Sequence, residues 1–150
     1  MTDSAESENE MRFRPFEGMW LLRNYPTGAL ACGKIVDGKL FIPFSFSEQK
    51  KAVGHCYDCH VVGGKLVCRF EHFDSATSGA LCLAVGPNHT LTGRRWLKDQ
   101  IPDSFLQNII TLPDSLPSKQ DVVWIRVLDK ELPAWAQKYF TEDWPNKNQA

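Results

Sequence analysis

The sequence lacks long apolar runs, since none approaches the roughly 20 residues that a helix needs to cross a bilayer. It also lacks an excess of charge of either sign, because 17 basic side chains stand against 18 acidic ones. This balance disfavours partners recognised by the charge of the whole chain, such as nucleic acid or anionic lipid. Residues 1–10 contain no apolar segment of a signal peptide. We therefore expect a cytoplasmic protein without a membrane partner.

The sequence contains five cysteines, an odd number. Five thiols without a secretion signal predict free cysteines in a reducing compartment. A chain of 150 residues that is 43% hydrophobic can bury a core without a metal or a disulfide. We expect a disordered acidic leader over residues 1–11, a single β-barrel-like domain over residues 12–145 and a frayed tail over residues 146–150.

Short apolar stretches separated by glycine dominate the chain and predict β-structure. The expected elements are an opening strand, three hairpins, a helix, a closing strand and a C-terminal helix, over residues 19–24, 29–46, 54–73, 79–96, 103–111, 121–128 and 131–143. This order predicts a mainly β fold of about eight antiparallel strands in a meander, with one helix before the last strand and another at the C-terminus. Such a sheet closes fully or partly into an up-and-down barrel, because closure removes exposed strand edges.

The hairpin over residues 54–73 has the clearest turn, because a tight primed turn needs positive φ at both central residues and Gly63-Gly64 supplies them. Counting outward from the turn pairs His60 with Val67 and Cys59 with Cys68. Alternate pairs share one face, which then carries Val61, Cys59, Tyr57, Leu66, Cys68 and Phe70, with His55 and His72 at its far end.

Two further hairpins follow from their turn residues. Asp37-Gly38 is a strong turn dipeptide, and counting outward from it pairs Ile35 with Leu40 and Ala31 with Phe44. The third hairpin admits loops of different lengths, so its register stays open.

Four residues of the hairpin around Gly63-Gly64 are candidates for a ligand site, namely His55, Tyr57, Phe70 and His72. If their face lines a cavity, two imidazoles and a phenol could orient a ligand or shuttle a proton, since histidine titrates near neutrality. The alternative is a hydrated rim without a role. No nucleophile or orienting carboxylate accompanies the histidines. We therefore assign no catalytic residue, and an enzyme that uses a histidine as general base is the least favoured class.

The segment from Cys56 to His60 matches the attachment motif of c-type haem. Haem attachment normally follows export, and the predicted strand points Cys56 and Cys59 to opposite faces. A zinc site formed by Cys56, Cys59, Cys68 and His72 is disfavoured for the same reason. Tetrahedral zinc needs four donors that converge on one point, and the predicted strand points Cys56 to the other face. The four donors would converge only if a kinked turn replaced the strand. We expect no cofactor and no metal, and cysteines that pack as small apolar side chains.

The run Arg94-Arg95-Trp96 has the composition of a phosphate or single-strand contact. Strand alternation points one arginine outward and the other inward or along the rim. A solvated arginine that packs on a tryptophan is the commoner outcome, so we do not expect a nucleic-acid partner.

The segment Phe16-Glu17-Gly18-Met19-Trp20 resembles the Phe-x-Gly-x-Trp entry of the calycins, the superfamily of lipocalins, fatty-acid-binding proteins and avidins. The resemblance implies that Gly18 lets the chain pass close under the barrel floor and that Trp20 plugs that end. It also implies an arginine from the last strand stacked on the tryptophan, for which Arg126 is the candidate. The lipocalin Thr-Asp-Tyr signature does not accompany this segment.

These observations favour a non-catalytic binding protein that holds a small, largely apolar ligand in a β-barrel cavity. The alternative is a homodimeric protein-interaction module without a small-molecule ligand. It would use an exposed sheet face or the tryptophan-rich C-terminal helix. Small residues such as Ala31 and Gly33 suit either a closed barrel or two packed sheets, so both interpretations stay open.

Overall fold

The computed structural model describes residues 8–23, 29–46, 51–73, 75–111, 116, 120–128 and 131–141. The described chain begins with helix α1 (Glu8–Phe13) and the 3-10 turn η1 (Arg14–Phe16). Residues 8–11, which the sequence assigns to the leader, are therefore helical. The rest of the predicted leader and the predicted tail lie outside the described residues.

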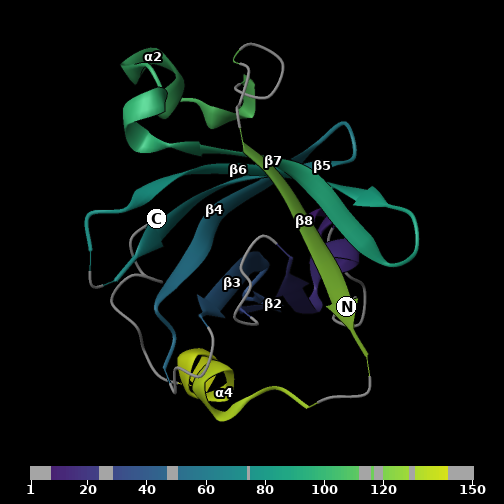
Figure 1. The fold of residues 1–150 in the computed structure, drawn as a ribbon. Coiled ribbons are helices and arrows are strands. Elements are labelled where there is room, and N and C mark those ends of the chain that lie inside the picture. The colour runs from purple at the N-terminus through teal and green to yellow at the C-terminus, as the bar shows by residue number, and fades with distance from the viewer. Residues whose placement is uncertain are drawn as a thin grey trace.

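Eight antiparallel strands form a closed barrel (Figure 1). They are β1 (Gly18–Leu22), β2 (Leu30–Val36), β3 (Lys39–Ser45), β4 (Gly54–Val62), β5 (Lys65–His72), β6 (Ser78–Gly86), β7 (Thr90–Leu97) and β8 (Gln120–Val127). Each strand pairs with its neighbours in sequence, and β8 pairs with β1 to close the sheet. The predicted mainly β meander is confirmed, in its fully closed form.

Two of the tight turns have the predicted backbone conformation. The φ angles are 53° and 78° at Asp37-Gly38, and 59° and 79° at Gly63-Gly64. Around the first of these turns the register is also as predicted, since Ala31 pairs with Phe44. Turn chemistry therefore sets the pairing of β2 with β3.

The hairpin of β4 and β5 contains a β-bulge that the sequence analysis did not anticipate. From the turn to His60 the strands pair as predicted, but the register shifts between Tyr57 and His60. Asp58 has a φ of 51° in the bulge, a conformation that aspartate adopts more readily than most residues. Cys56, and not Tyr57, consequently pairs with Phe70. The predicted faces of β4 are wrong beyond the bulge, because a shift of one residue moves each of its side chains to the opposite face, whereas Phe70 and His72 of β5 lie on the predicted face.

Helix α4 (Ala134–Thr141) covers one outer face of the barrel (Figure 1). Its buried side chains are Trp135, Ala136 and Tyr139. They belong to a cluster with Met19, Cys32, Phe41 and Ala52 on the outside of the barrel. The helix is the predicted C-terminal one, but it begins three residues later than the pattern indicates because residues 131–133 are not helical.

A second outer layer follows β7 and consists of η2 (Lys98–Gln100), α2 (Asp103–Leu106) and η3 (Ile109–Thr111). It lies on the opposite side of the barrel from α4 (Figure 1). Trp96 is buried under this layer with Ile101 and Ile109. The single predicted helix over residues 103–111 is therefore replaced by two shorter helical segments. None of the described helices has the length and apolar character that a membrane span requires.

The two ends of the barrel differ. Phe13 and Phe16 of α1 and η1 join the interior core at the end where β1 begins. The pairing of Gly18 with Gly33 places the β2–β3 turn at that same end. We call this the closed end. The opposite end, where β5 ends at His72 and β8 begins at Gln120, is called the open end.

Candidate functional site

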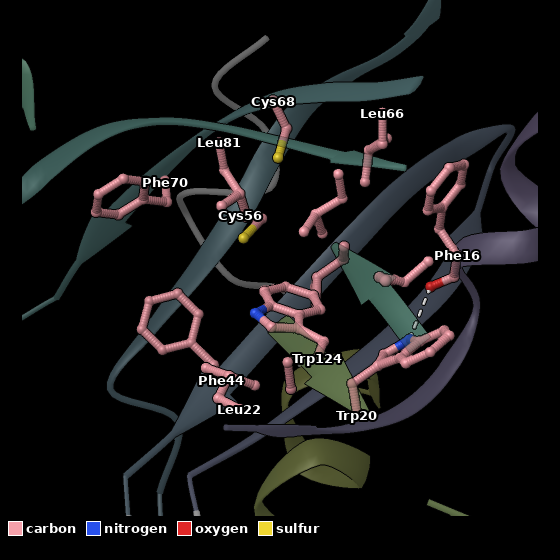
Figure 2. Packing of buried hydrophobic residues seen from close by; sticks show 14 of the residues in the cluster. Phe16, Trp20, Leu22, Phe44, Cys56, Leu66, Cys68, Phe70, Leu81 and Trp124 are labelled. Carbon is pink, nitrogen blue, oxygen red and sulfur yellow. Dashed lines mark hydrogen bonds between the residues drawn. The ribbon is translucent and has the colours of Figure 1, made fainter. Parts of the chain in front are cut away.

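A pocket enters the barrel at the open end. Eleven residues line it: Leu22, Phe44, Phe46, Cys56, Phe70, His72, Leu81, Arg95, Gln120, Val122 and Trp124. The space between these side chains is about 50 Å³. Figure 2 shows six of the apolar lining residues around the interior, with Trp124 below Cys56 and Leu81. The wall is thus apolar, and the space suits a small chemical group.

The polar side chains of the pocket belong to residues near the strand ends of the mouth. Arg95 pairs with Gln120, and its Nη1 donates a hydrogen bond of 3.3 Å to the Gln120 Oε1. The guanidinium carbon of Arg95 lies 5.0 Å from the centroid of the Phe70 ring, within the range of a cation–π contact. The guanidinium is therefore held between the polar mouth and the apolar wall.

His72 is surrounded by aromatic rings. Its ring centroid lies 5.4 Å from that of Phe44 and 5.4 Å from that of Phe46. Burial lowers the pKa of His72, and the charge of Arg95 lowers it further. The imidazole is therefore neutral at pH 7 and offers one hydrogen-bond donor and one acceptor.

Trp20 and Arg126 lie together at the closed end. Trp20 is buried, and its Nε1 donates a hydrogen bond of 3.2 Å to the carbonyl oxygen of Phe16 (Figure 2). Arg126 pairs with Trp20 across β1 and β8, and its guanidinium carbon lies 4.4 Å from the centroid of the indole. Gly18 has a φ of 106°, and a Cβ there would lie 2.8 Å from Arg126 Nη1. A larger residue at Gly18 would therefore displace the guanidinium.

Three thiols belong to the barrel interior. Cys56 and Cys68 point into it (Figure 2), and Cys59 packs against the same core. The bulge thus brings Cys56 to the face of the other two thiols, which corrects the prediction that it points away. Contact with Cys68 and burial together raise the pKa of Cys56. Within the described residues, no group of three or more His, Cys, Asp or Glu side chains is arranged to hold a metal ion.

His55 lies on the outside of the barrel, beneath α4. Its Nδ1 lies 2.6 Å from the Tyr139 hydroxyl oxygen, and its Nε2 lies 2.8 Å from Glu71 Oε2. The carboxylate accepts a hydrogen bond from Nε2–H, and Nδ1 shares a hydrogen bond with the Tyr139 hydroxyl. His55 and Tyr139 are both fully buried. This network connects β4 and β5 to α4 and does not reach the pocket.

The structure divides the four predicted ligand residues into two pairs. Phe70 and His72 line the pocket, whereas His55 and Tyr57 face outward, where their rings stack at 5.0 Å. The role of Arg95 in the pocket was not predicted from the sequence. Alternation had indicated that one arginine of the Arg94-Arg95 pair points inward, and the open register of the third hairpin left the choice between them undecided.

Arg94 lies on the outer face of β7, with its guanidinium carbon 5.5 Å from the centroid of the Trp96 ring. Trp96 is only 1% exposed, and its Nε1 donates to the carbonyl oxygen of Leu116. The ring is therefore covered by protein and gives no platform on which a nucleotide base could stack.

Comparison of the chain with models of protein families, with characterised proteins and with solved structures found no match.

Proposed function

We propose that this chain is a non-catalytic binding protein that holds a small, largely apolar ligand in the open end of its barrel. The observation that carries the proposal is the pocket itself, with an apolar wall and three polar side chains near its mouth. Binding sites for small molecules combine an apolar lining with a few polar groups that fix orientation. Among its lining residues the pocket contains one imidazole, His72, and one thiol, Cys56, whose raised pKa keeps it protonated, and it contains no carboxylate or hydroxyl, which supports binding over catalysis.

The size of the pocket limits the ligand. Sites for drug-sized molecules measure about 300–1,000 Å³. The space here is about 50 Å³, so the part of the ligand inside the barrel is a short chain or a small ring. The rest of the ligand lies at the mouth, next to Phe46 and His72.

The test is an NMR titration of the whole chain with 1-pentanol, a short apolar probe. We expect shifts of backbone amides to concentrate on residues around the pocket. The His72→Trp variant places a larger ring at the mouth and should abolish these shifts. Thr92→Trp adds the same ring at an exposed position on β7 and should leave them unchanged. Shifts that spread over the surface, or that persist in His72→Trp, would contradict the proposal.

We further propose that the barrel is of the calycin type. Support comes from the 3-10 turn that precedes β1, from the positive φ of Gly18 and from the contact of Arg126 with Trp20. A solved crystal structure that superposes on known calycins over the whole barrel is the decisive measurement. A chain path that departs from theirs at η1 and β1 would refute the assignment.

A homodimer is the second candidate, favoured by one feature of the closed end. Met11, Val62 and Val85 are 60%, 43% and 60% exposed and line one surface groove. Grouped apolar side chains on a surface are a mark of interaction sites. Sedimentation velocity at several protein concentrations tests this candidate, and Val85→Lys should convert a dimer into a monomer.

A further inference from the structure

We propose that Cys59 and Cys68 form a peroxide-responsive thiol pair, in which hydrogen peroxide oxidises Cys59 and the product closes a reversible disulfide with Cys68. The pair lies at the β-bulge between β4 and β5. Neither residue lines the pocket at the open end, so this modification site is independent of the proposed function.

The bulge places the two thiols opposite each other. Its register leaves Asp58 and Cys59 of β4 opposite the single residue Cys68 of β5. Opposite residues of an antiparallel pair have Cα atoms about 4.5–5.5 Å apart, and a disulfide spans about 4.4–6.8 Å. Cys68 is also in side-chain hydrogen-bond contact with Cys59. A disulfide between them therefore fits the strands as they are paired in the barrel.

A third thiol, Cys56, lies on the other side of Cys68. The two side chains are in hydrogen-bond contact, and Figure 2 shows both sulfur atoms inside the barrel. Cys56 pairs with Phe70, however, so it meets Cys68 diagonally across the two strands. Diagonal neighbours are about 7–8 Å apart, which exceeds the usual span of a disulfide. The geometry favours Cys59 as the partner of Cys68.

Exposure decides which thiol the peroxide reaches first. Of the five cysteines, all of them among the described residues, four are buried and Cys59 is partly exposed. The hydrogen bond with Cys56 lowers the pKa of Cys68, but the bond with Cys59 and burial together raise it well above the ordinary value. Because the thiolate is the nucleophile, Cys68 is a poor target for peroxide from solvent. It reacts in the second step, when the oxidised sulfur of Cys59 lies beside it.

The chemistry has two balanced steps. The Cys59 sulfur attacks one oxygen of hydrogen peroxide, the O–O bond breaks, and a sulfenic acid and water form. The Cys68 sulfur then attacks the sulfenic sulfur, so that an S–S bond forms and the S–O bond breaks. The hydroxyl leaves as water with the proton of Cys68. The two thiols lose two electrons and peroxide gains them, and a dithiol reductant reverses the change by exchange.

The test is a peptide map of the whole folded chain after treatment with hydrogen peroxide and blocking of free thiols with N-ethylmaleimide. Trypsin cuts after Lys65 and separates Cys59 from Cys68, and endoproteinase Asp-N cuts before Asp58 and separates Cys56 from Cys59. We expect one linked pair of peptides that joins Cys59 to Cys68 and that separates after reduction with dithiothreitol. A bond that involves Cys56, or a chain without any disulfide, would overturn the proposal.

Variants then assign the two roles. Cys68→Ala should leave the sulfenic acid of Cys59 open, so dimedone should label Cys59 at least about fivefold more than in the parent protein. Equal labelling would refute Cys68 as the second reactant. Cys59→Ala should abolish the disulfide of Cys68.

The matched control is Cys32→Ala, which removes a buried thiol from the cluster on the outside of the barrel. It should form the disulfide to the same extent as the parent protein. Loss of the disulfide in this control would show that the bond does not depend on the pairing of β4 with β5. The peptide map of the unaltered chain decides the proposal even where a variant fails to fold.

Discussion

The guanidinium carbon of Arg126 lies 4.4 Å from the centroid of the Trp20 indole, on the strand that closes the barrel against β1. Arg126 Nη2 also donates a hydrogen bond of 3.3 Å to the carbonyl oxygen of Pro15. One side chain therefore connects the last strand, the first strand and the turn that precedes it. These contacts close the barrel end opposite to the pocket.

Replacing Arg126 with Met should destabilise the fold by about 1 kcal/mol, because it removes the cation–π contact and the bond to Pro15. Chemical denaturation measures the change. Arg94→Met is a suitable control, since Arg94 packs over Trp96 at the longer distance of 5.5 Å, and it should cost less. An unchanged midpoint in Arg126→Met would show that the closed end does not depend on this side chain.

Tyr139→Phe should destabilise the fold by about 1–3 kcal/mol, because it removes the hydrogen bond between the tyrosine hydroxyl and the buried Nδ1 of His55. Hydrogen exchange should also quicken in α4, since this bond connects the helix to the barrel. Tyr57→Phe removes a hydroxyl from a half-buried residue on the same outer face and should cost less than about 0.5 kcal/mol. Equal effects of the two substitutions would contradict the role assigned to Tyr139.

The strands could be predicted from the sequence because their turns carry strong signals, as at Gly63-Gly64. The bulge could not, because the apolar pattern of the strand fits both registers, with either Tyr57 or Cys56 facing the interior. Asp58 gives only a weak indication, since many aspartates adopt other conformations. The bulge changes which residues belong to the candidate site, because it turns the Cys56 side chain inward and the Tyr57 side chain outward.

The direction of the Arg95 side chain could not be predicted from the sequence for a related reason. The pairing of Gly86 with Thr90 shows that the β6–β7 loop consists of residues 87–89. That length directs Arg95 into the barrel and Arg94 away from it. The partners of His55 could not be predicted from the sequence either, because Tyr139 is 84 positions away and no local pattern connects the two residues.

Four of the five cysteines should react slowly with iodoacetamide in the native protein. Cys32, Cys56, Cys68 and Cys82 are buried, and burial raises the pKa of Cys32 to about 12. At pH 8 only about one in ten thousand Cys32 side chains is then in the reactive thiolate form. Mass spectrometry should find little modification of these four thiols in the folded protein and five modified thiols in urea. Rapid modification of Cys56 in the folded protein would show that the barrel opens to solvent at that site.

His72 should make the stability of the protein depend on pH. Burial first, and the charge of Arg95 second, lower its pKa in the folded state below the ordinary value of 6.5. Above that value the ring is neutral in both states and the difference has no effect. As the pH falls below it, the unfolded chain takes up a proton more readily than the folded protein, so stability is lost. Urea midpoints at pH 7.5 and pH 5.5 measure this loss, which should be smaller in His72→Gln than in the parent protein.

Arg95→Met should raise the pKa of His72 in an NMR titration of the ring, because it removes one of the two causes of the lowered pKa. A pKa at or above the ordinary value in the parent protein would contradict the position of His72 inside the pocket.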